Sequence, residues 1–414
     1  MILRISTNTS NLNINKQIVR VVRVYNRNVP EGITQDEFTQ KGGILSGSGA
    51  GTFGELTPGS TGQYLTPDSS EPLGLKWETP TVTVDDTTNH LINGGFYLAQ
   101  PQAPGTLTTV ADGGYGPDQW KMTRENADLQ YIRVDGSSES GLTSPYFGQF
   151  KKITNAGKLL IAQPLEYLDT LKFRGKTINF QVQMKASAAK TIKIAVVELQ
   201  TGGTADTLPA LVSAWGADGV DPTLGANLAT IGTPTTCSVT TAWQTFQFTG
   251  TFPAASKNLL VMVWSNADFA ANDTLSLAEA GLYYGANART WVPKKTVEEI
   301  LICKRYYRKS FPRDTAPAQS AGATGSVRFT AGKAGALSNL VYILFAVPMR
   351  TTPTIVTYNP DAANAHVRDQ TAGADCSGTS TFPNDEDLVI TATGNASTAV
   401  GNTLRIHYTA DARL

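Results

Sequence analysis

The chain has 414 residues with 34 Lys plus Arg, 34 Asp plus Glu and three histidines, so its formal net charge is zero. A neutral chain has no general attraction for nucleic acid or for anionic membrane surfaces, and neither is expected as a partner. Charged residues make up only 16% of the chain, which instead holds 38 Gly, 21 Pro and 53 Thr. This composition favours an all-β protein, and the length predicts two or three domains, because single hydrophobic cores stop growing near about 250–300 residues.

The sequence lacks the patterns of a membrane span, a signal peptide and a cysteine-based disulfide or zinc site. The longest apolar run, Leu259–Trp264, is too short to span a bilayer, so no membrane insertion is expected. The first residues lack the apolar core of about 7–15 residues that a signal peptide carries, so we expect synthesis in a reducing cytoplasm without Sec export. Cys237, Cys303 and Cys376 are odd in number and widely spaced, which matches neither a disulfide framework nor a zinc site.

Residues 1–41 are predicted to be a docking segment. Ile18–Tyr25 is a β-branched run typical of a strand. It lies in a basic stretch without acidic residues, to which Arg20, Arg23 and Arg27 belong. The run is either an ordinary edge strand with solvated arginines or a strand that docks onto another subunit, with these three arginines at the contact.

Residues 42–88 are glycine-rich and are predicted to form a stalk or linker. Glycine supplies turns of positive φ, and a glycine-rich stretch has little core of its own. Isolated hydrophobic residues nevertheless recur, which a free linker would not need, so we expect this stretch to pack against copies of itself in an oligomer. These residues are Leu45, Phe53, Leu56, Tyr64, Leu65, Leu75 and Trp77.

Residues 89–291 are predicted to form one β-sandwich or jelly-roll domain. Apolar and polar residues alternate in Thr177–Lys185 and in Thr245–Thr251, which is typical of half-buried antiparallel strands. Leu259–Trp264 is apolar on both faces and predicts a central strand. The long insertion 201–236 is rich in Gly, Ala and Thr, so we expect it to be functional, ordered by a partner or disordered.

Residues 292–312 are predicted to be a helical connector, and residues 313–414 a second, smaller β domain. The helix is expected over Lys294–Lys309, bounded by Pro293 and Pro312. Its apolar stripe is Val297, Ile300, Leu301 and Tyr307. The strands of the C-terminal domain are predicted at 326–330, 339–347, 354–358, 387–393 and 403–409.

No residue pattern predicts catalysis, a cofactor or a dedicated metal site. Residues 49–54 have the Gly-x-Gly-x-x-Gly spacing, but the Thr-Pro-Gly that follows cannot open the helix which a dinucleotide site needs. His407 lies on the polar side of the last predicted strand and is expected at the surface. Asp385, Glu386 and Asp387 are interpreted as a solvated loop, with Ca²⁺ binding as the alternative, because hard cations prefer clustered oxygen ligands.

Aromatic side chains are the remaining candidates for ligand binding. Sugars stack their apolar faces on Trp or Tyr while neighbouring polar groups take the hydroxyls. Tyr115 and Trp215 lie among small and polar residues, so either ring is a candidate stacking platform for a glycan. The alternative is that each ring pins its loop to the sheet or to a neighbouring subunit. Trp243, Trp264 and Trp291 are expected in the core.

Several short motifs follow one another along the chain. They are Gly43–Thr52, Leu56–Ser69, Gly74–Trp77, Leu91-Ile-Asn-Gly-Gly-Phe96, Tyr115-Gly-Pro-Asp-Gln-Trp120, Phe173-Arg-Gly-Lys-Thr177, Glu298-Glu-Ile-Leu-Ile-Cys-Lys-Arg-Tyr-Tyr307, Pro348-Met-Arg-Thr-Thr-Pro353 and Tyr408-Thr-Ala-Asp-Ala-Arg-Leu414. Their order resembles that in tail-fibre and other virion proteins of tailed bacteriophages that contain a jelly roll like a carbohydrate-binding module. In the motif Tyr115–Trp120, Pro117 and Gln119 stand where that family usually has Ala and Arg.

The resemblance covers about residues 42–414. It implies a non-catalytic, homotrimeric fibre or appendage protein, made in the host cytoplasm and localised to the virion. Its implied partners are a host cell-surface glycan and, through the N-terminal segment, other virion proteins of the tail, baseplate, neck or capsid. The alternatives are a head fibre or capsid decoration protein, a surface-polysaccharide depolymerase and a cellular carbohydrate-binding module. Against the depolymerase, the sequence shows no long parallel β-helix repeat.

Overall fold

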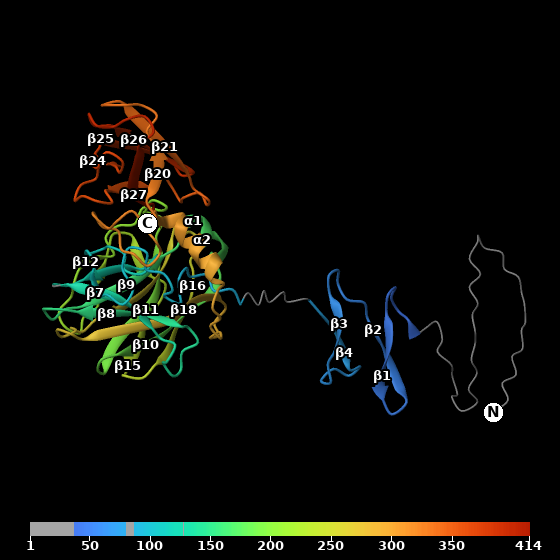
Figure 1. The fold of residues 1–414 in the computed structure, drawn as a ribbon. Helices are drawn as coiled ribbons and strands as arrows, with labels where there is room; N and C mark the ends of the chain where they lie inside the picture. The colour runs from blue at the N-terminus through green and yellow to red at the C-terminus, as the bar shows by residue number, and fades with distance from the viewer. Residues whose placement is uncertain (1–36, 80–86, 127) are drawn as a thin grey trace, which may run out of the picture. The chain divides into compact units, whose positions relative to one another are not determined.

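The computed structural model describes residues 37–79, 87–126 and 128–414. The chain divides into two compact units, residues 1–84 and 85–414, whose ribbon is drawn in Figure 1. The strands of both units pair antiparallel and helices are few, so the predicted all-β class is confirmed. Among the described residues, no helix is long and apolar enough to cross a membrane.

The described part of the first unit consists of two β-hairpins. The first hairpin turns through Gly49, Ala50 and Gly51, which all have positive φ. In the second, Trp77 donates its Nε1–H to the carbonyl of Thr57 at 2.6 Å, and its ring leaves no space for a Cβ on Gly59. The strands are β1 (Ile44–Gly49), β2 (Thr52–Leu56), β3 (Tyr64–Pro67) and β4 (Leu75–Glu78).

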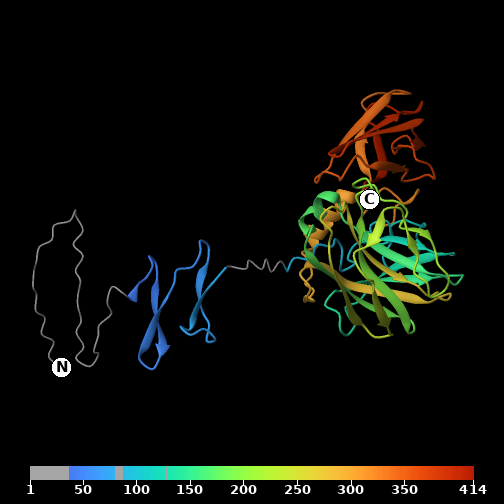
Figure 2. The same cartoon turned by 180° about the vertical axis from the view of Figure 1, so that it is seen from behind.

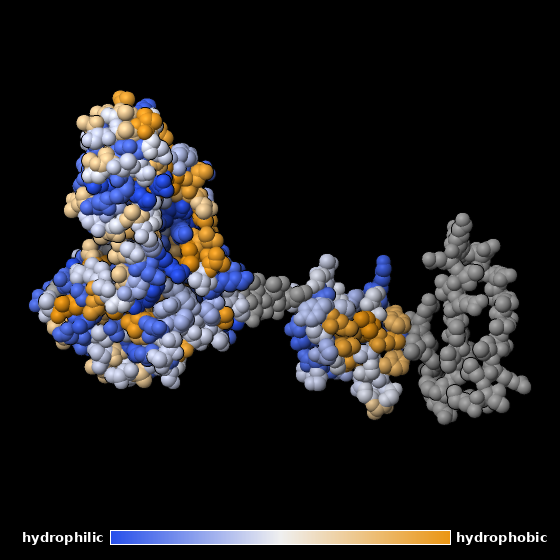
Figure 3. Space-filling model, in the orientation of Figure 1, coloured by the Kyte–Doolittle hydropathy of each residue, from blue (hydrophilic) through white to orange (hydrophobic). Residues whose placement is uncertain are grey.

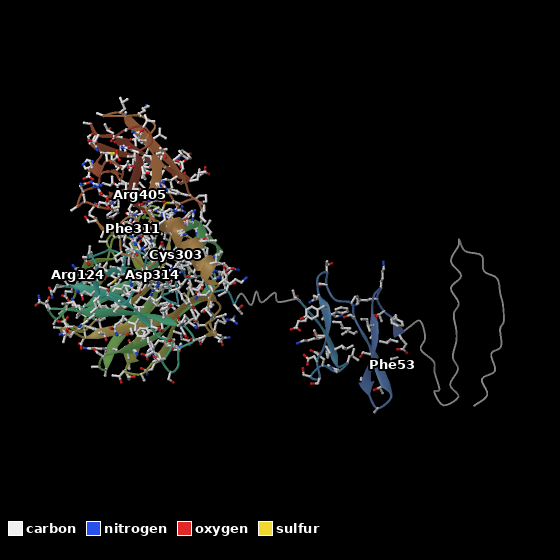
Figure 4. All side chains as sticks on the ribbon, viewed as in Figure 1. Phe53, Arg124, Cys303, Phe311, Asp314 and Arg405 are labelled. Atoms are coloured by element: carbon white, nitrogen blue, oxygen red, sulfur yellow. The ribbon has the colours of Figure 1, made fainter. Side chains whose placement is uncertain are left out.

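The first unit has no core in its described part. None of residues 37–79 is fully buried. Phe53, which is labelled in Figure 4, and Tyr64 are exposed. The packing of this segment against other copies of the chain stays a prediction.

The larger part of the second unit is a two-layered β-sandwich (Figures 1 and 2). One layer, the β10 sheet, has the strand order β16-β10-β18-β8-β7-β5. The other layer, the β17 sheet, has the order β14-β11-β17-β9-β6, and β15 also pairs with β11. The strands of the β10 sheet are β16 (Gln244–Thr251), β10 (Thr177–Ala186), β18 (Thr274–Tyr284), β8 (Tyr146–Lys152), β7 (Leu129–Asp135) and β5 (Thr108–Thr109). Those of the β17 sheet are β14 (Leu228–Thr230), β11 (Lys190–Leu199), β17 (Leu259–Ser265), β9 (Leu159–Pro164), β6 (Lys121–Arg124) and β15 (Thr235–Val239).

The apolar faces of the two sheets form the main core. The predicted alternation of β10 is confirmed on its apolar side, because all four side chains are fully buried there, and β17 is buried along its whole length as the predicted central strand. Burying alternate side chains of two facing sheets removes the largest apolar area from water. The four β10 residues are Ile178, Phe180, Val182 and Met184.

The insertion 201–236 is ordered against the sandwich. It contains the hairpin of β12 (Val212–Ala214) and β13 (Thr223–Leu224), followed by β14. Lys158, which is buried, donates to the carbonyl of Gly216 and pairs with Glu125 at 3.3 Å. The insertion is therefore fixed by contacts within the chain.

A short helical segment and one longer helix lie at the end of the sandwich that adjoins the C-terminal part. They are α1 (Tyr167–Thr170), the 3-10 turn Leu171–Phe173, and α2 (Thr296–Tyr306). Arg305 at the end of α2 forms a two-pronged ion pair with Glu166, next to α1, at 3.1 and 3.0 Å.

The predicted apolar stripe of α2 is buried at Tyr307 but is wrong for Val297 and Leu301. The buried residues are Glu299, Cys303 and Tyr306, whereas Val297 and Leu301 are exposed. The carboxylate of Glu299 accepts the backbone N–H of Asn93 and pairs with a lysine that precedes the helix, so a charged residue faces inward. The helix also ends earlier than predicted, because the chain at Tyr307 turns into a strand.

The C-terminal part is built around one long strand, β27 (Thr403–Asp411), and has a separate core. The strands β19, β20, β22 and β23 all pair with β27, and a second sheet has the order β21-β26-β25. The predicted strands of this part are present with shifts of up to three residues at their ends. The bounds are β19 (Tyr307–Lys309), β20 (Val327–Thr330), β21 (Ser338–Leu344), β22 (Thr354–Tyr358), β23 (Arg368–Asp369), β24 (Ala374–Asp375), β25 (Gly378–Pro383) and β26 (Asp387–Thr393).

His407 is buried, so its predicted place at the surface is wrong. Its ring stacks on Phe311 with centroids 3.9 Å apart, and Nδ1 lies 2.9 Å from the hydroxyl of Ser310. Nε2 lies 2.9 Å from the carbonyl of Gly322. The segment after α2 therefore covers the polar side of β27, and burial lowers the pKa of His407. Figure 4 labels Phe311 between the two parts of this unit.

The C-terminal residues join the two parts of the second unit. The chain end lies at the junction of these parts in both views (Figures 1 and 2). The guanidinium of Arg413 lies over the rings of Tyr115 and Tyr307, at 4.3 and 4.5 Å from their centroids. It also forms a two-pronged ion pair with Asp411. Because Tyr115 belongs to the sandwich and Asp411 to β27, this stack connects the two cores.

Candidate functional site

The outer face of the β10 sheet, which points away from the core, carries a block of polar side chains. Gln183 pairs across the sheet with Thr245, and Gln181 pairs with Gln247. Thr245 and Gln247 are exposed, while Gln181 is buried beneath the segment that follows β18. The face therefore presents amide and hydroxyl groups and is covered at one end.

A bulge in β18 turns Glu279 onto this face. The pairing of β10 with β18 shifts register between Gln181 and Gln183, and Glu279 has a φ of 50°. A bulge leaves one residue unpaired and re-aims its side chain. Oε1 of the buried carboxylate accepts the backbone N–H groups of Thr143 and Ser144, the second at 2.8 Å, and Oε2 accepts the amide of Gln183 at 2.7 Å. Glu279 thereby ties the loop before β8 to the sheet.

The segment after β18 completes a cavity over the polar face. The amide of Gln181 exchanges two hydrogen bonds with the backbone of Arg289, at 2.6 and 2.8 Å. Trp291 is buried and donates its Nε1–H to the carbonyl of Ala280 at 3.3 Å. The resulting cavity has a volume of about 230 Å³. Its lining residues are Thr143, Gln181, Gln183, Thr245, Glu279, Arg289, Thr290 and Trp291.

Trp243 lies two residues before Thr245, a residue of the cavity lining. Its half-buried ring packs edge-on against Phe147 with centroids 5.2 Å apart, and its Nε1–H is donated to Glu139 at 3.0 Å. The ammonium of Lys185 lies 4.9 Å from the Trp243 ring centroid and 2.7 Å from Glu139. The hydrogen bond from Lys185 is the main cause that holds the pKa of Glu139 below its ordinary value. The indole is therefore held in place, and the residue as a whole is partly exposed to solvent.

The predicted core position is confirmed for Trp264 and Trp291 but is wrong for Trp243. The sequence contains the signal that would have placed it. Side chains two residues apart on a strand share a face, and Trp243 precedes the polar positions Thr245 and Gln247 in that spacing. Extending the alternation of β16 by one step puts Trp243 on the outer face.

The chemistry of this face suits a hydroxyl-rich ligand. Amides and hydroxyls can both donate and accept hydrogen bonds, and the half-open indole offers an apolar surface beside them. Glu279 is the one carboxylate among the lining residues, and both of its oxygens already accept hydrogen bonds from the chain.

Tyr115, a predicted glycan-stacking residue, instead contacts the C-terminal residues. Its hydroxyl donates to the carbonyl of Leu414, which also accepts from Lys121 at 3.2 Å. The half-buried ring lies against the Arg413 guanidinium and, at 5.4 Å, the Lys121 ammonium. Burial raises the pKa of Tyr115 well above its usual value. This placement matches the alternative that the ring pins segments of its own chain.

Trp215, the other predicted stacking residue, also makes intramolecular contacts. Its half-buried ring packs against the main core, and its Nε1–H is donated to the carbonyl of Arg124 at 3.1 Å. The ring thus fixes the insertion 201–236 to the end of β6. The structure brings neither Trp215 nor Tyr115 into the lining of the cavity.

Replacing Trp215 by Ala is expected to lower the free energy of unfolding by about 2 kcal/mol, less than the 3–5 kcal/mol of a fully buried Trp. Urea unfolding measures this change. Trp215→Phe is the matched control and should recover most of the loss, because it removes the hydrogen bond but keeps the packing. A loss of glycan binding with unchanged stability would instead support the stacking role of Trp215.

The N-terminal arginines and the acidic run 385–387 are the remaining candidates from the sequence. Arg20, Arg23 and Arg27 lie outside the described residues, so their docking role stays a prediction. Among the residues that the structure describes, no group of three His, Cys, Asp or Glu side chains is arranged to hold a metal ion. In the acidic run, Asp387 accepts the hydroxyl of Tyr342.

No family model matches the chain, and no curated protein matches it. Three solved structures illustrate what a comparison of structures finds. The carbohydrate-binding module TmCBM61, in complex with β-1,4-galactotriose, is 12% identical over 48% of this chain and 99% of that one, with a TM-score of 0.28. A family 4 carbohydrate-binding module is 14% identical over 47% of this chain and 98% of that one, with a TM-score of 0.26. The enzymatically active domain of bacteriophage CBA120 tailspike protein 4 is 8% identical over 48% of this chain and 21% of that one, with a TM-score of 0.30.

Proposed function

We propose that this protein is a non-catalytic virion appendage protein of a tailed bacteriophage that attaches to a host cell-surface glycan. The observation that carries the glycan-binding part is the cavity on the outer face of the β10 sheet, with the half-open ring of Trp243 beside it.

The side chains on this face have the polarity that sugar recognition needs. Gln183 and Thr245 line the cavity, and Gln247 continues the row along β16. Their amide and hydroxyl groups match sugar hydroxyls, which are both donors and acceptors. The indole of Trp243 provides a face on which the C–H groups of a sugar ring pack. Such a site binds weakly on its own, and several copies on one particle increase the avidity without new contacts.

The virion part of the proposal rests on the motifs that resemble phage fibre proteins. Residues 1–41 dock the protein to other virion proteins, with Arg20, Arg23 and Arg27 at the contact. The glycine-rich segment then associates with identical segments in a homotrimer. The lack of any fully buried residue among 37–79 supports this association, because such a segment gains a core only by packing against another chain.

Binding of purified host-surface polysaccharide, measured by titration calorimetry, tests the glycan site. Trp243→Ala is expected to weaken binding at least tenfold. Thr245→Ala is expected to weaken binding about threefold and to leave the unfolding temperature unchanged. Thr191→Ala is the matched control, because Thr191 is an exposed threonine on β11 of the opposite sheet. Binding unaffected by both cavity variants would refute this site.

The same samples test the absence of catalysis. Incubation of the protein with the polysaccharide is expected to release no new reducing ends. Sustained turnover would refute the non-catalytic part of the proposal and favour the depolymerase.

A further inference from the structure

The three-stranded sheet β21-β26-β25 of the C-terminal part carries large apolar side chains on both faces. Its inner face contributes Leu388 and Ile390 to the C-terminal core. Its outer face also carries large apolar side chains, and these point into solvent. They are Leu340 (64% exposed), Tyr342 (55%), Leu344 (74%) and Phe382 (59%).

These outer side chains form adjoining rows rather than isolated exposed residues. Tyr342 of β21 pairs with Val389 of β26, which pairs with Phe382 of β25, so one apolar row crosses all three strands. Leu340 and Leu344 lie two residues to either side of Tyr342 on the same face. Directly opposed side chains on one face of antiparallel strands lie close enough to touch. The five residues therefore make one patch, the β21 face.

The β21 face is nearly free of charge. Its one charged side chain is Asp387, opposite Leu344, and the carboxylate accepts the hydroxyl of Tyr342. A partner that binds through charges, such as nucleic acid or an acidic or basic peptide, finds no complementary group here. The complementary surface is another flat, apolar and neutral face.

The same unit exposes further apolar residues on its helices. Val297 and Leu301, one turn apart on α2, are exposed, and so is Leu168 of α1. Apolar residues follow the edge of this unit that carries α2 in Figure 3. Contiguous apolar surface of this kind marks interaction sites in soluble proteins.

We propose that the β21 face is covered by a second copy of this chain. The chain itself supplies the neutral and apolar counterpart, because in the proposed homotrimer the same region of the neighbouring copies can pack against this face around the three-fold axis. The described part of the first unit points to the same partner, because residues 37–79 contain no fully buried side chain and expose Phe53 and Tyr64. The inference deepens the association proposed above by naming its surface, and it does not depend on the glycan site.

Sedimentation of the full chain with charges placed on this face tests the proposal. The wild type is expected to sediment as a multiple of its 44.1 kDa mass. The double variant Leu340→Lys/Phe382→Lys is expected to raise the dissociation constant at least a hundredfold, because both lysines would be buried opposite uncharged residues, Thr391 and Val389. Val400→Lys is the matched control, since Val400 is 67% exposed in the same part but lies outside the sheet.

A labelling experiment gives an independent readout without charge. The three natural cysteines are buried, so Leu344→Cys and Val400→Cys each add one exposed thiol. In the assembly, the thiol at 344 is expected to react with a soluble maleimide at least tenfold more slowly than the thiol at 400. Equal labelling rates, a monomeric wild type at micromolar concentration, or an unchanged mass of the double variant would each overturn the proposal. Calorimetry with the polysaccharide on the same variants reports on the glycan site separately.

Discussion

Replacing Arg413 by Ala is expected to lower the free energy of unfolding by about 3 kcal/mol and to separate the unfolding of the C-terminal part from that of the sandwich. The substitution removes the cation from between the rings of Tyr115 and Tyr307 and breaks the two-pronged ion pair with Asp411. Breaking a buried ion pair costs about 3–5 kcal/mol and each cation–π contact contributes about 0.5–2 kcal/mol. The partial exposure of Asp411 places the expected loss at the lower end.

Denaturant unfolding followed by intrinsic fluorescence measures both effects. Arg413→Lys keeps the charge but lacks the planar guanidinium, which stacks on two tyrosine rings and donates two hydrogen bonds to Asp411. It should therefore recover less than half of the lost free energy of unfolding. Arg328→Ala is the control, because Arg328 on β20 is exposed. A single transition with a change below about 0.5 kcal/mol for Arg413→Ala would contradict the role of this stack.

Replacing Glu279 by Ala is expected to lower the free energy of unfolding by about 3 kcal/mol and to abolish glycan binding. The backbone N–H groups of Thr143 and Ser144 and the amide of Gln183 would lose their common acceptor. Hydrogen bonds to a charged group contribute about 1.5–3 kcal/mol each, and water entering the emptied space offsets part of the loss. The loop before β8 would then no longer be held over the cavity.

Two variants separate the contributions to this effect. Glu279→Gln keeps one acceptor oxygen but directs an NH₂ group at other donors, so we expect a loss of about 1–2 kcal/mol. Glu139→Ala removes the other carboxylate of this face, which is partly exposed, and should cost less than about 1 kcal/mol. Urea unfolding and calorimetric titration are the measurements. Equal losses for Glu139→Ala and Glu279→Ala would show that the bulge has no special role.

The regular strands could be predicted because their signal is local. In β10, apolar and polar residues alternate, and burying one side fixes the register, since a slip of one residue would reverse both faces. The run in β17 is apolar on both sides and accordingly lies in the middle of its sheet. The same rule places Trp243 on the outer face when the alternation of β16 is followed back by one step.

The buried polar groups could not be predicted in this way. Glu299 faces inward because the backbone N–H of Asn93, about 200 residues away, provides a donor for its carboxylate. His407 is buried because the segment with Ser310 and Phe311 folds over the polar side of β27. A polar residue in a strand pattern indicates solvent unless a distant segment supplies a partner.

The sequence by itself determined the all-β class, the main strands and the glycine-rich segment, because period-two alternation and glycine's backbone freedom act over a few residues. Only the tertiary structure decided that Tyr115 and Trp215 hold their own chain together, and that Glu279 lines a cavity. These side chains meet residues far away in sequence, and a one-residue bulge that turns Glu279 leaves no signal in the pattern. The low charge of the chain acquires a location in the same way, on the outer face of β21-β26-β25, where Asp387 is the one charged side chain.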